Sequence, residues 1–435
     1  MQRNRINRLA VIAALSLPLI QSQSAVNAQQ ITTAPQIVPV EAFLDGLGVN
    51  GHVSWPGRYP YSATERVAEA MAYLGVRNLR DHVNADTFPV FERLAAKGVR
   101  FNLLTHPKVD LRSHISWARR LTIAFPGSVV ALEGPNEVDK WPVEFRGLSG
   151  PKAAAAMQQA LYTSANADPY LADIPIYNLT VSGISRENSA ELGDLSAYAD
   201  YANVHPYYRA GQQSWGHSRA DTRYTLRNYI ISARWSAPGR PVVVTETGSS
   251  SSPASVIGVT EEVQAKQVLN SLLATARHGV RATYIYELVD SQNAGPRDVE
   301  SHYGLFRYDW SPKPAADALG NLTRILRSPE GRALEGSAPP RFSLAGMPDT
   351  GASLLMVDEN GVYSIVLWAE PDLWDEDSDR PIPAPAHTVS IDFGQTARPA
   401  ALYDPLVSDR PLKTFSPSRR IEVSLTDHPL IVRLL

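Results

Sequence analysis

The sequence predicts a (β/α)8 barrel followed by a small antiparallel β-sandwich domain. The barrel is predicted because short apolar runs that end in polar residues alternate with amphipathic helical stretches, as parallel strands alternate with crossover helices. Eight such runs lie between residues 43 and 327, the number that closes a barrel of this kind. After residue 340 the pattern changes to short strands of alternating polarity, which predicts a separate β-domain over residues 341–435.

An open doubly wound sheet is the alternative that the same alternation allows. In that fold a glycine-rich loop follows the first strand and binds phosphate. The glycines between Leu47 and Gly51 do not have the spacing of that motif. The sequence therefore favours the barrel.

The composition bounds the class of protein. At 435 residues the chain is longer than one hydrophobic core usually supports, so two domains are expected. The formal net charge of -3 gives no electrostatic reason to expect nucleic acid or an anionic membrane as a partner. Because the chain has no cysteine, thiol nucleophiles, cysteine-ligated zinc and iron–sulfur clusters are excluded.

Residues 1–28 have the pattern of a secretory signal peptide. Three arginines precede the apolar stretch from Leu9 to Ile20, and the small residues at Val26 to Ala28 suit a signal peptidase. A membrane anchor is the alternative, but the apolar stretch is too short to span a bilayer comfortably. We therefore expect a periplasmic or secreted protein with no membrane association after cleavage.

An N-terminal arm, residues 29–42, is expected to lie extended on the surface before the barrel of residues 43–327. The predicted barrel strands are Leu44 to Val49, Val76 to Val83, Val99 to Thr105, Val129 to Glu137, Ile174 to Val181, Tyr201 to Tyr207, Pro241 to Glu246 and Ala282 to Val289. Predicted helices between them run from a capping box at Ser62–Glu65 to Tyr73, from Phe91 to Lys97, from Ser113 to Phe125, and from Glu261 to Arg277 with Thr260 as N-cap.

A linker over residues 328–340, rich in Gly, Pro and Ser, is expected to end the barrel. Asn360-Gly361 between two apolar runs is a strong hairpin signal. The segment from Asp372 to Pro385 is acidic and proline-rich, and we expect a solvated loop, because it lacks the spacing of an EF-hand calcium site. Strands of the β-domain are predicted at Ser353 to Val357, Val362 to Trp368, Thr388 to Phe393, Ala400 to Tyr403, Ile421 to Leu425 and Leu430 to Leu435.

Two predicted strands, the fourth and the seventh, end in glutamate. In barrels of this kind the chemistry lies at the C-terminal ends of the strands. A single glutamate there more often forms a salt bridge in a loop, but two on strands that face each other across a barrel can meet. Glu137 and Glu246 are therefore predicted to form a carboxylate pair that cleaves a glycosidic bond.

This combination resembles the retaining glycoside hydrolases of clan A, and in particular family 39-type enzymes with an accessory β-domain. In these enzymes an Asn-Glu pair ends strand four and provides the acid/base, and a glutamate that ends strand seven is the nucleophile. The resemblance places these roles on Asn136-Glu137 and on Glu246. It also implies that the site contains a strand-two arginine and the histidine and tyrosine of a His-x-Tyr pattern in strand six, here Arg80, His205 and Tyr207.

The mechanism expected of such a pair needs one ionised and one protonated carboxyl, about 5–5.5 Å apart. Glu246 would attack the anomeric carbon while Glu137 protonates the departing oxygen and then serves as base for water. Arg80 and Tyr207, if near Glu246, would keep it ionised, and its charge would raise the pKa of Glu137. Asn136 is suited to bind the sugar 2-hydroxyl. No metal or organic cofactor is expected in this chemistry.

Further residues near strand ends are candidates for sugar binding. His106 ends strand three, and Glu287 lies in the last strand, where many clan A enzymes have a tryptophan. Tryptophans that follow strands one, four and six could stack on sugar rings, although each could equally pack beneath its own loop; they are Trp55, Trp141 and Trp215. Trp117 and Trp235 lie in predicted helices and are expected in the core.

Two other functions stay open. A non-catalytic carbohydrate-binding barrel is one, although the presence of both glutamates argues against it. The other is a metal-dependent barrel hydrolase that uses three histidines, but these lie on separate strands without a His-x-His pair; they are His82, His106 and His205. Because several strand-end loops carry tryptophan, the expected substrate is a β-linked oligo- or polysaccharide in an extended cleft.

Overall fold

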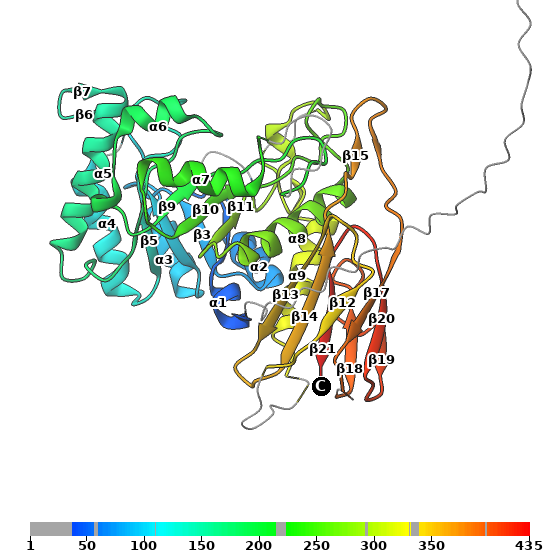
Figure 1. The fold of residues 1–435 in the computed structure, drawn as a ribbon. Helices are drawn as coiled ribbons and strands as arrows, with labels where there is room; N and C mark the ends of the chain where they lie inside the picture. The colour runs from blue at the N-terminus through cyan, green and yellow to red at the C-terminus, as the bar shows by residue number, and fades with distance from the viewer. Residues whose placement is uncertain are drawn as a thin grey trace, which may run out of the picture.

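The computed structural model places a barrel and a β-sandwich side by side (Figure 1). It describes residues 37–55, 60–108, 110–214, 223–291, 295–329, 331, 339–395 and 398–435. The signal-like residues 1–28, Trp215 and most of the predicted linker lie outside these ranges. No helix in the described ranges has the length and apolar character needed to cross a membrane.

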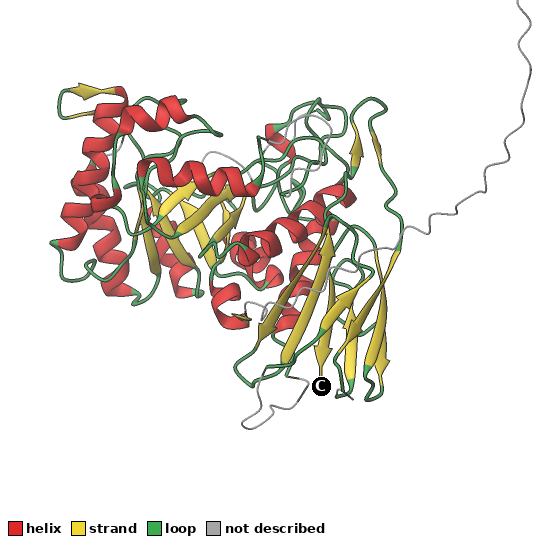
Figure 2. Ribbon diagram, viewed as in Figure 1, coloured by secondary structure: helices red, strands yellow, loops and turns green. Residues whose placement is uncertain are grey.

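The barrel is closed, which excludes the open doubly wound sheet. Its eight strands pair in parallel in the order β8-β5-β4-β3-β2-β11-β10-β9, and a bridge between Tyr177 and Tyr201 joins the first to the last. Figure 2 shows these strands enclosed by helices. The strands are β2 (Leu47–Asn50), β3 (Asn78–Asp81), β4 (Arg100–Leu104), β5 (Val129–Glu133), β8 (Ile176–Tyr177), β9 (Ala202–Val204), β10 (Val242–Thr247) and β11 (Thr283–Ile285).

The helices around the barrel follow the predicted order. Thr260 caps α8 as predicted, since its hydroxyl accepts from the Val263 N–H, and Gly75 ends α2 with a φ of 67°. The capping box at Ser62 is wrong, because the N-cap is Ala63 and makes no side-chain bond. The helices are α2 (Thr64–Leu74), α3 (Phe88–Ala96), α4 (Leu111–Ala124), α5 (Gly150–Asn166), α6 (Arg186–Leu192), α7 (Leu226–Ser236), α8 (Glu261–Arg277) and α9 (Pro314–Leu326), with 3-10 turns at Ser196–Tyr198 and Glu300–His302.

The second domain is a sandwich, as predicted. One sheet has the order β1-β13-β14-β21-β18-β19, and a three-stranded sheet, β12-β17-β20, covers one of its faces. The apolar side chains between them include Leu355, Ile365, Val389 and Val423. The strands are β12 (Ser343–Ala345), β13 (Gly351–Val357), β14 (Tyr363–Ala369), β17 (His387–Asp392), β18 (Ala400–Tyr403), β19 (Lys413–Phe415), β20 (Arg420–Leu425) and β21 (Leu430–Leu434).

The other face of the larger sheet packs on the barrel. Side chains of β13 and β14, among them Met356 and Trp368, share one apolar cluster with Leu269 of α8 and Leu322 of α9, and Figure 1 shows α8 and α9 between the two parts of the molecule. Asn270 adds polar contacts, donating to the carbonyls of Ala369 and Asp427. The barrel and the sandwich therefore share part of one hydrophobic core.

Two segments that were expected to form an arm and a loop on the surface contain helix or strand. In the N-terminal arm, β1 (Ile37–Pro39) pairs in parallel with β13, and α1 (Val40–Asp45) follows it. The acidic segment after Asp372 forms a hairpin of β15 (Trp374–Asp375) and β16 (Arg380–Pro381), whose Trp374 packs against Ala210 and Val259 in barrel loops. Burial of tryptophan outweighs the polar composition of the segment. A smaller hairpin, β6 (Glu144–Phe145) with β7 (Leu148–Ser149), follows β5.

His428 makes the interface between barrel and sandwich sensitive to pH. Its imidazole lies 2.8 Å from Asp427 and 3.0 Å from Asp404, and Lys266 of α8 lies 2.6 Å from Asp427. Burial alone would lower the pKa of His428, but the hydrogen bonds to both carboxylates outweigh burial and raise it to about 9. The imidazolium therefore stabilises the fold below the unfolded-state pKa near 6.5, and this stabilisation is lost as pH rises through about 9.

We expect the His428→Asn variant to unfold more easily than the wild type by about 2–3 kcal/mol at pH 6, and by much less at pH 10. Denaturant titrations at the two pH values measure this difference. The matched control is His387→Asn in β17, which belongs to the three-stranded sheet and not to the sheet that packs on the barrel; we expect no comparable loss of stability at pH 6. An equal destabilisation by His428→Asn at both pH values would contradict the prediction.

Candidate active site

The two predicted glutamates lie at the C-terminal end of the barrel, after β5 and in β10, two strands that β8 and β9 separate. Glu246 lies within β10. Glu137 lies beyond the end of β5, because that strand stops at Glu133 and not at Glu137 as predicted. Its backbone has a φ of 39°, and Thr180 holds this turn through bonds from the N–H groups of Glu137 and Val138. A non-glycine residue in this region needs such support from its surroundings.

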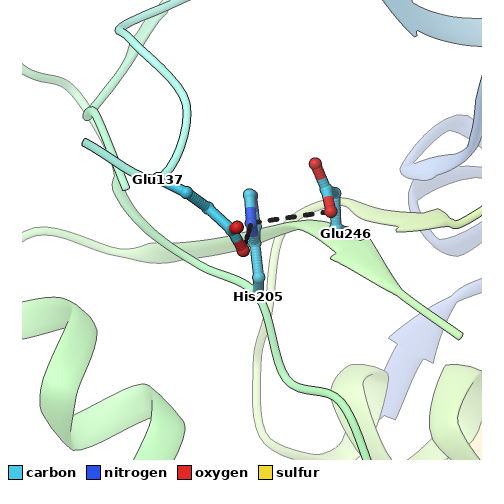
Figure 3. A group of neighbouring side chains, drawn as sticks. All are labelled: Glu137, His205 and Glu246. Atoms are coloured by element: carbon cyan, nitrogen blue, oxygen red, sulfur yellow. Dashed lines mark hydrogen bonds and ion pairs between the residues drawn. The ribbon is translucent and has the colours of Figure 1, made fainter. Parts of the chain in front are cut away.

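His205 lies between the two carboxylates (Figure 3). Its Nδ1 is 3.2 Å from Oε1 of Glu137 and 3.7 Å from Oε2 of Glu246. One carboxylate oxygen from each glutamate and one ring nitrogen lie within 4.8 Å of one another. The two carboxylates are therefore close enough to act on one glycosidic bond between them.

Arg80 and Tyr207 contact the carboxylate of Glu246. The guanidinium Nη1 lies 2.6 Å from Oε1, and the tyrosine hydroxyl donates to Oε2 at 2.8 Å. Burial raises the pKa of Glu246, but the positive charges of His205 and Arg80 outweigh burial and lower it below the ordinary value. Glu246 is therefore held ionised, as a nucleophile must be.

Glu133, which the sequence analysis missed, binds the side of Arg80 that does not contact Glu246. It is fully buried in β5, and its carboxylate receives Nε and Nη2 of Arg80 at 2.9 Å and 2.7 Å. Asn102 and Asn203 donate to the same carboxylate. A buried charged group needs a partner. The position of Glu133 at the end of the apolar run VVALE could therefore have indicated a buried ion pair. Glu133 fixes the Arg80 side chain that contacts Glu246.

The surroundings of Glu137 differ from the expectation. Lys140 Nζ lies 2.9 Å from Oε2, while His205 contacts Oε1. Burial raises the pKa of Glu137, but the hydrogen bond from His205 and then the ammonium of Lys140 outweigh it and lower the pKa to about 2. The predicted upward shift is therefore wrong for the free protein, because the contacts with His205 and Lys140 outweigh the effect of burial.

The hydrogen bonds of His205 place its proton. Thr245 donates its single hydroxyl proton to Glu133 or Asn203, each 2.9 Å away. The hydroxyl must then accept from Nε2 of His205, which lies 3.0 Å from it. Nε2 of His205 therefore carries a proton, and Nδ1 faces Oε1 of Glu137 at 3.2 Å. Asn136 is fixed nearby, since its side-chain oxygen accepts from Arg80 at 2.7 Å.

The remaining candidates lie around the rim or below it. Trp55, whose side chain is 39% exposed, stacks on His52 at 4.7 Å, and Trp141 is 63% exposed. Glu287 is fully buried and binds Tyr61 at 2.8 Å and His52 at 3.2 Å. Glu287 therefore supports His52 from behind and does not face the site, contrary to its predicted contact with the sugar.

The predicted core tryptophans are only partly in the core. Trp117 is half-buried and packs at the edge of the main cluster. Trp235 is half-buried on α7 with the guanidinium of Arg186 over its ring. Each tryptophan is only half-buried because it lies toward the solvent-facing side of its helix.

The three histidines of the metal-dependent alternative do not come together. His82 and His106 contact each other, with ring centroids 4.7 Å apart, whereas His205 pairs with Glu137. Within the described residues, the group with the ligand types and spacing for a metal ion is Glu137, His205 and Glu246. Lys140 and Arg80 already pair with its two carboxylates, which disfavours a further cation there.

Neither a family model nor a curated protein matches the sequence. Solved structures do match. A family 39 glycoside hydrolase from the gut symbiont Bacteroides cellulosilyticus has a TM-score of 0.60 at 12% identity, over 92% of this chain and 83% of that one. A monomeric beta-xylosidase from Caulobacter crescentus has a TM-score of 0.58 at 14% identity, over 92% of this chain and 97% of its own. A glucosidase from Croceicoccus marinus has a TM-score of 0.56 at 11% identity, over 92% and 96%. This chain therefore has the fold of a family 39 glycoside hydrolase, a (β/α)8 barrel joined to a β-sandwich.

Proposed function

We propose that this protein is an exported retaining glycoside hydrolase that cleaves β-linked oligo- or polysaccharides, with Glu246 as nucleophile and Glu137 as acid/base. The observation that carries the proposal is the pair of carboxylates, with oxygens within 4.8 Å of each other at the ends of two strands of the barrel. Retaining enzymes use carboxyls about 5–5.5 Å apart, whereas inverting enzymes need roughly 6.5–9.5 Å to admit a water molecule. The fold shared with solved glycoside hydrolases supports the same reaction class.

In the first step the ionised carboxylate of Glu246 attacks the anomeric carbon, and the bond to the leaving oxygen breaks. Glu137, in its protonated form, gives its proton to that oxygen, so the leaving sugar departs as a neutral alcohol. Arg80 holds the side chain of Asn136. Asn136 would bind the sugar 2-hydroxyl, a contact that strengthens in the transition state. The product of this step is a glycosyl ester on Glu246.

In the second step a water molecule attacks the anomeric carbon of the ester. Glu137, now ionised, takes the proton of the water, and the carboxylate of Glu246 leaves. Lys140 and His205 favour the ionised form of Glu137, which suits a base. Arg80 favours the ionised form of Glu246, which suits a leaving group.

Export and substrate are inferred from other features. The arginines and the apolar run within residues 1–28 support export to the periplasm or medium. Exposed Trp55 and Trp141 support sugar binding at the rim. Because similar structures include a beta-xylosidase and a glucosidase, β-xylosides and β-glucosides are the first substrates to test.

The experiment is a panel of aryl β-glycosides and β-linked glycans, with the product anomer followed by NMR from the start of the reaction. We expect the β-anomer to form first and then to mutarotate. Initial formation of the α-anomer would refute the retaining mechanism. Lack of hydrolysis across the panel, with binding intact, would favour a carbohydrate-binding barrel.

A further inference from the structure

The first step of the reaction described above does not explain the position of Lys140. Its Nζ lies 2.9 Å from Oε2 of Glu137, on the oxygen that His205 does not contact. The lysine side chain is 58% exposed, whereas that of Glu137 is 11% exposed. An exposed ammonium therefore lies on the solvent side of the proposed acid/base.

The turn that carries Lys140 is fixed, so that only its side chain needs to move. The N–H groups of Lys140 and Trp141 donate to the carbonyl of Glu137 at 2.8 Å and 2.9 Å. The carboxylate of Asp139 accepts from the N–H and hydroxyl of Ser182, at 2.8 Å and 2.7 Å, and from Asn188 at 2.9 Å. The ammonium can leave Glu137 without any change in this backbone.

The first step of catalysis requires Lys140 to leave. Glu137 must carry a proton when the leaving oxygen departs, and an ammonium on its carboxylate favours the ionised form. A neutral sugar hydroxyl competes poorly with a carboxylate for an ammonium, because it lacks the Coulomb attraction between opposite charges. An anion on the leaving sugar would compete well.

We infer that the subsite on the leaving-group side binds a uronic acid residue, whose carboxylate takes the Lys140 ammonium from Glu137. The exposed ring of Trp141, the next residue on the same turn, offers an apolar surface for that sugar. This inference rests on the proposed function. In this inference the acidic leaving sugar has two effects. It binds the Lys140 ammonium, and Glu137, without that ammonium, can hold the proton that the leaving oxygen needs.

The experiment compares two disaccharides with the same β-linked sugar at the cleaved position, chosen from the aryl glycoside panel. One has glucuronic acid at the reducing end and the other has glucose. We expect the wild type to show a kcat/KM at least about tenfold higher for the acidic one, the ratio that corresponds to 1.4 kcal/mol. Lys140→Met should remove this preference, and Lys140→Arg should keep most of it. The control, Lys97→Met, removes a lysine that pairs with Glu65 on the helices and should behave as wild type.

Two readouts separate this role from a merely structural one. The alkaline limb of the pH profile for the neutral disaccharide should move to higher pH in Lys140→Met, because the pKa of Glu137 rises without the ammonium. In the Glu246→Gln background, calorimetry should show tighter binding of the acidic disaccharide, and this difference should vanish when Lys140→Met is added.

Equal kcat/KM values for the two disaccharides in the wild type, or a preference that survives in Lys140→Met, would overturn the inference. Either result, with glycosides still hydrolysed with retention, leaves the proposed function standing. Absence of hydrolysis on every glycan would overturn both.

Discussion

The Glu246→Gln variant is expected to lose hydrolysis of β-glycosides by a factor of about 10⁴ or more, the scale seen when a catalytic nucleophile is removed. The amide has the shape of the carboxylate, so Arg80 can still donate to its oxygen and Tyr207 can accept from its nitrogen. Only the nucleophile is lost. Initial rates on the best aryl glycoside measure the effect, and thermal unfolding checks the fold.

The matched control for that variant is Glu300→Gln. Glu300 is exposed, and its charge interacts with that of Glu246, but it takes no part in the proposed reaction. We expect its kcat to stay within about fivefold of wild type, a change of roughly 1 kcal/mol in the barrier. A 2-fluoro glycoside that forms a slow ester should label Glu246 in a peptide mass map. Label on another residue, or full turnover by Glu246→Gln, would show that the nucleophile is misassigned.

The Glu137→Ala variant is expected to lose activity according to the leaving group. For sugar or alcohol leaving groups, which need a proton, kcat/KM should fall by about 10²–10⁴. A 2,4-dinitrophenyl glycoside needs no proton to depart, so formation of its ester should be nearly normal and the second step should limit turnover. Steady-state and pre-steady-state rates on the two kinds of substrate measure the difference.

Azide tests the same variant from the other direction. Removal of the Glu137 carboxylate leaves a space next to two groups that can bind an anion, His205 and Lys140. Azide in that space should restore turnover and yield the β-glycosyl azide. Equal losses for all leaving groups, or an α-azide product, would contradict the assignment of Glu137.

The strands and the acid pair could be predicted from the sequence because both follow from local patterns. Apolar runs alternate with capped helices, and this periodicity depends on nothing far away in the chain. The ends of those runs gave Glu137 and Glu246, since strand ends meet at one rim. The runs were read too long, however: β5 ends at Glu133, and β8 contains only Ile176 and Tyr177.

Other features depended on contacts between distant segments. Glu133 was counted as part of an apolar run, because its partner Arg80 lies 53 residues away. The ammonium on Glu137 could not be foreseen, since it depends on a backbone turn with a φ of 39° at that residue. The hairpin that carries Trp374 has an acidic, proline-rich composition, and only the barrel loops that it covers explain its order.

The buried link from Glu133 through Arg80 to Glu246 has a consequence for how such proteins diversify. The charge state of Glu246, the proposed nucleophile, depends on the buried side chains of His205 and Arg80, and buried Glu133 holds Arg80 in place. Insertions or exchanges in the surrounding loops can thus alter which glycan is accepted without retuning the reactive atoms. The loops can therefore change during evolution while the catalytic residues stay the same, so that new substrate specificities arise without a change in the reaction.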